Sequence, residues 1–135
     1  MKNILNVLIF LLITVSCKAQ LQLDTLNYVK QFEINKAQYV NKPFSYLLDH
    51  MTQMQPKSHW SDTPFRNKKI VESSRFKFSG MDYSFKNAVT LNIIWQESFP
   101  ESDVKYLQNK NEYYFTNEEK DFYKNKVVKD ILVYK

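Results

Sequence analysis

Two histidine–aspartate pairs are the residues whose types could support catalysis. His59 lies three positions before Asp62, and Asp49 directly precedes His50. Histidine is the usual general base near neutral pH, and a neighbouring carboxylate would orient its ring. A small hydrolase that uses His59 with Asp62 is therefore one hypothesis. The chain has no Gly-x-Ser-x-Gly and no His-Glu-x-x-His motif to support it, so we predict no catalytic residue.

The residue counts argue against several other chemistries. The chain has a single glycine, which excludes the glycine-rich loops that bind phosphates and dinucleotides. Two histidines without further ligands define no zinc geometry, so we predict no metal and no cofactor. The net charge of +5 is a mild excess, and although basic residues such as Lys68, Lys69, Arg75 and Lys77 could form a patch, the export predicted below leads us to expect no nucleic-acid partner.

Glu97 is the one polar residue in a series of alternating apolar positions. The segment Val89–Phe99 otherwise places an apolar side chain at every second position, as a half-buried strand does. A buried Glu97 would be paired or would have a raised pKa, and a glycosidase would need a second carboxyl such as Glu101 across a cleft. The alternative, which we favour, is that the apolar face ends near Trp95 and Glu97 reaches solvent.

Trp60 and Arg66 are the best candidates for binding another molecule. Both lie in Thr52–Lys69, a polar stretch that we predict to be a loop, and long loops in small domains often carry function. Tryptophan and arginine are also frequent anchors of protein interfaces. We therefore predict a binding site of Trp60, Arg66, His59 and Asp62. Two alternatives are that Trp60 stacks on a sugar or that its ring folds back over the core.

The N-terminal residues 1–19 predict export. Lys2 precedes Ile4–Val15, an apolar run that is too short to span a bilayer and is typical of a secretory signal. Residues 14–17 resemble a bacterial lipobox, which would place cleavage before Cys17 and attach lipid to that cysteine. Cleavage after Ala19 is the competing prediction, and both remain open.

The leader as a whole, with the sequence SCKAQ after a short run of isoleucine and leucine, resembles the leaders of small envelope proteins and lipoproteins of Bacteroidetes. The resemblance covers the leader alone. It implies a protein of the periplasm or an outer-membrane lipoprotein, or alternatively a secreted protein, and it implies no activity. Cys17 is the only cysteine, so the exported domain has no internal disulfide.

Residues 20–135 predict a single domain of the α+β class. We expect two N-terminal helices packed on a small, mostly antiparallel sheet of three to four strands, with a helix before the last strand. Thr116 and Glu119 have the spacing of a capping box at the start of that helix. The expected helices are Asp24–Ala37, Pro43–Met51, Ser102–Asn109 and Thr116–Lys124, and the expected strands are Ile70–Phe78, Val89–Phe99, Glu112–Phe115 and Val127–Tyr134.

These observations predict a small exported envelope protein that binds another protein and has no enzymatic activity. An assembly accessory, an inhibitor and an immunity factor would all fit. The alternative is a module that binds a glycan or a small ligand, and the hydrolase is the third hypothesis. The sequence identifies neither the partner nor the oligomeric state.

Overall fold

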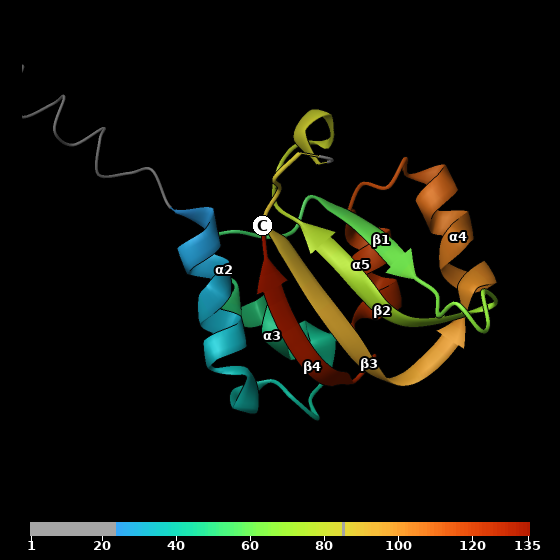
Figure 1. The fold of residues 1–135 in the computed structure, drawn as a ribbon, viewed down its shortest axis with the longest axis horizontal. Coiled ribbons are helices and arrows are strands. Elements are labelled where there is room, and N and C mark those ends of the chain that lie inside the picture. The colour runs from blue at the N-terminus through green and yellow to red at the C-terminus, as the bar shows by residue number, and fades with distance from the viewer. Residues whose placement is uncertain (1–23, 85) are drawn as a thin grey trace, which may run out of the picture.

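The structure is a computed structural model that describes residues 24–84 and 86–135 (Figure 1). The predicted leader, Cys17 and residues 20–23 lie outside the described residues. None of the described helices is long and apolar enough to cross a membrane. The elements in chain order are α2 (Thr25–Ile34), the 3-10 turn η1 (Lys36–Gln38), α3 (Phe44–His50), β1 (Ser58–Asp62), β2 (Ile70–Lys77), the 3-10 turn η2 (Met81–Tyr83), β3 (Thr90–Pro100), α4 (Glu101–Lys110), α5 (Asn117–Tyr123) and β4 (Val128–Tyr134).

The four strands form one antiparallel sheet in which each strand neighbours the next strand of the chain. The predicted α+β class with an antiparallel sheet is confirmed. The segment predicted as the main strand becomes β3, which pairs with β2 on one side and β4 on the other. Its alternating residues Leu91, Ile93 and Trp95 are all buried, as the period of two predicts.

Two predicted elements are wrong. The stretch Thr52–Lys69 is not a continuous loop, because it contains β1. The core-facing residues of β1 are His59 and Ser61, so the strand lacks the apolar alternation that normally reveals one. The segment Glu112–Phe115 is a turn with a single bridge rather than a strand. Glu112 and Tyr113 have φ angles of 51° and 65°, and this left-handed conformation cannot continue a strand.

The core lies between the sheet and two helices, α3 and α5, which are behind the sheet in Figure 1. Aromatic rings fill this layer. The ring of Phe44 on α3 lies 4.8 Å from Phe76 and 5.4 Å from Trp95, and Tyr123 on α5 stacks on Trp95 at 5.4 Å. The predicted capping box forms at the start of α5, where Thr116 and Glu119 each bind the backbone of the other.

Both outer strands have partners along their edges. Helix α2 lies beside β4 (Figure 1), where Lys30 Nζ donates to the carbonyl of Val133 at 2.9 Å and Glu33 Oε1 accepts from the Val133 N–H at 3.1 Å. On the opposite edge, the His59 N–H donates to the carbonyl of Tyr113 at 3.0 Å. These contacts occupy backbone groups through which an edge strand would otherwise pair with another chain.

Candidate functional site

One face of the sheet points away from α3 and α5, and we call it the open face. Strand register places its side chains in three rows that cross all four strands. Figure 1 looks onto this face, and among the described residues no helix lies across it. The rows are Ser58, Lys77, Thr90 and Tyr134; Trp60, Arg75, Asn92 and Leu132; and Asp62, Ser73, Ile94 and Asp130. Ser58 and Thr90 of the first row are buried, and the Ser84 hydroxyl contacts that of Ser58, so the open part of the face consists mainly of the other two rows.

Trp60 is held in place at the centre of β1. Its ring stacks on Tyr113 with the centroids 5.8 Å apart and an angle of 17° between the planes. The ammonium of Lys77 lies 4.8 Å from the centre of the same ring, and it also donates a hydrogen bond to the carbonyl of Ser84. Burial, with a smaller contribution from the nearby Arg75, lowers the pKa of Lys77. A half-buried tryptophan fixed in this way presents a preorganised surface to a partner.

Two ion pairs involve residues of the open face. Arg75 donates to both carboxylate oxygens of Asp62, from Nε at 2.9 Å and from Nη2 at 2.7 Å. At the other side of the face, Lys36 Nζ lies 2.6 Å from Asp130 Oδ1. Such pairs fix side-chain positions and leave the face without a strong net charge.

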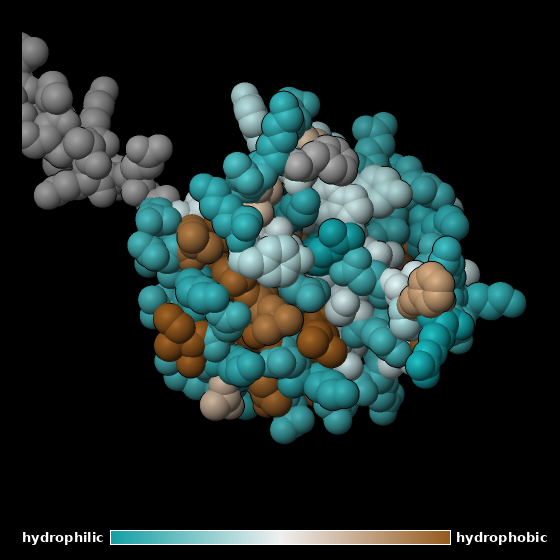
Figure 2. Space-filling model, in the orientation of Figure 1, coloured by the Kyte–Doolittle hydropathy of each residue, from teal (hydrophilic) through white to brown (hydrophobic). Residues whose placement is uncertain are grey.

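Apolar side chains lie next to these pairs, towards β4 and α2. Leu132 is 39% exposed, Tyr134 is 46% exposed and Ile34 of α2 is 66% exposed. Figure 2 shows hydrophobic surface gathered over α2 and the adjoining part of the sheet, with polar surface around it. The open face thus combines an apolar area with a fixed aromatic stack and paired ions, which is the composition of a protein interface.

The structure separates the four residues of the predicted binding site. Trp60 and Asp62 lie on the open face, whereas His59 points to the opposite side of β1 and is fully buried. The reason is the period of two in a strand, which places neighbouring residues on opposite faces. Arg66 lies apart from both, exposed in the turn between β1 and β2.

Neither histidine forms the proposed pair with an aspartate. The Nδ1 atom of His59 lies 3.3 Å from the hydroxyl of Tyr123, and Asp62 is bound to Arg75 on the other face of the sheet. Burial lowers the pKa of His59 to about 4, although the nearby Glu119 acts in the opposite direction. The ring of His50 is hydrogen-bonded to the carbonyl of Tyr46 at 2.7 Å. Within residues 24–84 and 86–135, no cluster of three or more His, Cys, Asp or Glu could hold a metal ion.

Glu97 is exposed, as favoured from the sequence. The register between β3 and β4 shifts at Trp95, and only Trp95 and the residues before it pair with β4. Glu97 therefore lies beyond the part of β3 that pairs with β4, in the irregular stretch between the β2–β3 pairs Ser73–Ile94 and Val71–Phe99. It lines a hollow of about 340 Å³ with Phe99, Phe122 and Lys126, and no second carboxylate is found among the described residues that line this hollow.

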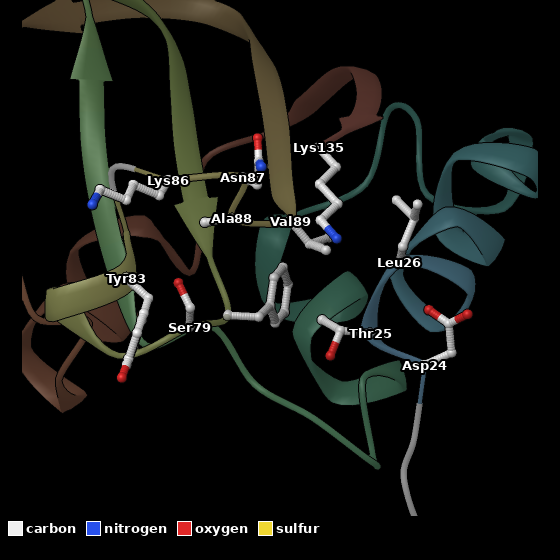
Figure 3. Close-up of a pocket in the computed structure, with 11 residues that line it drawn as sticks. Asp24, Thr25, Leu26, Ser79, Tyr83, Lys86, Asn87, Ala88, Val89 and Lys135 are labelled. Carbon is white, nitrogen blue, oxygen red and sulfur yellow. The ribbon is translucent and has the colours of Figure 1, made fainter.

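A second hollow of about 340 Å³ lies where α2 begins and β4 ends. Figure 3 shows Asp24 and Lys135 on one side of it and Tyr83 and Lys86 on the other. Its lining among the described residues holds one carboxylate and no histidine or cysteine. This combination does not support acid–base or nucleophilic catalysis.

The sequence interpretation missed most of the open face. Arg75 and Lys77 were visible as basic residues that share one side of a predicted strand, but their partners were not. Asp62 lay in the predicted loop, and Tyr113 in a predicted strand. The alternation of Trp60 with Asp62 and of Arg75 with Lys77 was the available signal, because residues two apart share a face of a strand.

Comparison of the chain with protein-family models, with curated proteins and with solved structures finds no match. The fold and the open face therefore define the class of protein here: a small α+β domain whose antiparallel sheet has one helix-covered face and one open face.

Proposed function

We propose that this is an exported, non-enzymatic envelope protein that binds another protein through the open face of its sheet. In this proposal α3 packs on the other face of the sheet and α2 lies along the β4 edge, so that both N-terminal helices leave the open face accessible. The observation that carries it is the arrangement around Trp60, whose ring is held between Tyr113 and Lys77 beside the Arg75–Asp62 pair. Tryptophan, tyrosine and arginine are the residue types that most often dominate binding energy.

The partners of the two sheet edges support a contact through the face. The β4 edge is bound by side chains of α2 at Val133, and the β1 edge is bound by the turn at Tyr113. A partner that added a strand would have to displace these groups, whereas a partner that docked on the face would displace only water.

Protein binding accounts for the surroundings of Trp60 better than sugar binding does. A tryptophan that binds a sugar presents a free ring face for stacking. The ring of Trp60 is already in contact with both Tyr113 and Lys77. No observation on the described residues favours a hydrolase, because the groups proposed for it lie on opposite faces of β1.

The proposal can be tested by quantitative capture from an envelope extract of the native cells. The baits are the full chain, a Leu132→Arg variant on the open face and a Tyr106→Arg variant on α4. Leu132 and Tyr106 are both exposed, so neither change is expected to unfold the domain. A protein retained by the full chain and by Tyr106→Arg, but lost from Leu132→Arg, would support the proposal. Equal retention by all three baits would contradict it.

A further inference from the structure

The turn between β1 and β2 presents one aromatic ring almost entirely to solvent. Phe65 is 94% exposed, more than any other large hydrophobic residue among those the structure describes. Exposure of a phenylalanine to this extent is unfavourable in water, because burial would contribute about 25 cal/mol of favourable free energy for each Å² of apolar surface removed from water. We call Pro64–Lys69 the basic turn.

Cations surround this ring. Arg66, Lys68 and Lys69 are all exposed, and the basic turn contains no acidic residue. Within the described part of the chain, none of the three forms a salt bridge. This differs from Arg75 and Asp62 on the open face, which form an ion pair.

The basic turn is held by hydrogen bonds rather than being a loose loop. The Asn67 N–H donates to the carbonyl of Pro64 at 3.1 Å, and the Asn67 side chain accepts from the Lys69 N–H at 3.1 Å. The carbonyl of Lys69 accepts from the N–H of Glu101 at 2.8 Å, which ties the turn to the start of α4. The ring is thus presented by a fixed backbone, which reduces the entropy lost on binding.

We propose that the basic turn docks on an anionic lipid surface, with Phe65 inserted at the level of the headgroups. An aromatic ring at a projecting tip, flanked by unpaired cations, matches the two contributions to peripheral membrane binding: burial of apolar area and attraction to anionic headgroups. A lipid surface needs no shaped pocket to accept such a tip. The turn lies at the opposite end of the sheet from the start of α2 (Figure 1), so this contact is distinct from the lipidation predicted at Cys17.

The test is a fluorescence measurement on the full chain carrying Cys17→Ser, which prevents lipidation. The emission of this parent chain, which contains Trp60 and Trp95, is subtracted from that of each variant so that the added tryptophan is observed alone. Phe65→Trp is mixed with vesicles of phosphatidylglycerol or of phosphatidylcholine, each with brominated acyl chains that quench nearby tryptophan. Tyr106→Trp on α4 is the matched control, because Tyr106 is also exposed, at 67%. Binding of the leader to the vesicles would affect both variants, whereas insertion of the turn affects residue 65 selectively.

The expected result is a blue shift and quenching for Phe65→Trp on phosphatidylglycerol vesicles, absent for Tyr106→Trp and lost at high salt. Changing Arg66, Lys68 and Lys69 to glutamine in the Phe65→Trp chain should lower its partition coefficient onto phosphatidylglycerol vesicles about fivefold for each cation removed. The three changes together should lower it roughly a hundredfold. Equal signals on both lipids, or no shift on either, would overturn the proposal. Binding of the turn to an acidic protein in place of the vesicles would overturn it as well.

Discussion

The Nε2 atom of His59 lies 3.9 Å from Oε1 of Glu119 inside the core, and both side chains are inaccessible to solvent. Among the described residues this nitrogen has no hydrogen-bond partner. Burial of Glu119 favours its protonated form, but hydrogen bonds from Thr116 and Asn111 outweigh this and hold its pKa below the usual range. His59 is therefore a neutral ring beside a buried carboxylate that is already bound by other groups.

This relationship predicts that the protein loses stability in mild acid. The pKa of His59 is about 4 in the folded chain and near 6.5 when unfolded, so the unfolded state binds more protons between these values. Stability is thus fully present above pH 6.5 and falls as the pH decreases towards 4. We expect a loss of about 2 kcal/mol between pH 7 and pH 5 in urea unfolding measurements.

A His59→Phe variant is the control for this pH dependence. The site is lined by Phe76, Phe115 and Tyr123, so a ring of similar size fits its surroundings. Carboxylates titrate near pH 4, so the variant should show little change between pH 7 and pH 5. If the free energy of unfolding of this variant depends on pH as strongly as that of the unaltered chain, His59 is not the source of the pH dependence.

The capping box at α5 predicts a specific loss of stability. The Thr116 hydroxyl caps the Glu118 N–H at 3.2 Å and also bonds the buried carboxylate of Glu119. Thr116→Ala removes both contacts and should lower the free energy of unfolding by about 2 kcal/mol. Thr116→Ser keeps the hydroxyl and should lose less than half as much. Similar losses in the two variants would show that the hydroxyl is not responsible.

Glu33 is predicted to protect the edge of β4. Its carboxylate accepts from the Val133 N–H, and Glu33→Ala leaves that donor without this acceptor. We expect a loss of about 1–3 kcal/mol and self-association through the freed edge, measured by urea unfolding and by light scattering. Glu33→Gln retains an acceptor oxygen and should remain monodisperse under the same conditions. Association of both variants would contradict this role.

The ion pair on the open face should contribute little to folding. Both members of the Arg75–Asp62 pair are about one-third exposed, at 39% and 33% of their side chains. A double-mutant cycle with Arg75→Gln and Asp62→Asn should give a coupling energy below about 1 kcal/mol. The open face can then be altered in binding experiments without unfolding the domain. A coupling of several kcal/mol would instead assign the pair a structural role.

The amount of this fold that the sequence predicts depends on where each element gets its stability. The helix α3 was visible because Phe44, Leu47 and Leu48 form an apolar stripe, and β3 was visible from its alternation. The start of α5 was visible from the chemistry of its cap. These are local signals, because the residues that carry them are close in the sequence.

The parts that were missed depend on distant partners. The inward side of β1 consists of His59 and Ser61, which are accommodated by Tyr123 and Gln108 from two different helices. Polar residues that face the core give no hydrophobic period, so the apolar alternation that usually identifies a strand is absent from β1. The placement of Trp60 and Asp62 on one face follows from the existence of β1, because a segment predicted as a loop has no period of two that would bring them together.

The most direct test of a protein-binding open face is photo-crosslinking in the native cells. A benzoylphenylalanine is placed at Leu132 on the open face or at Tyr106 on α4, and the adducts are identified by mass spectrometry. We predict one defined adduct with a different protein from position 132 and none of that protein from position 106. The absence of an adduct at position 132, an adduct with a second copy of the chain, or the same adducts from both positions would contradict the account.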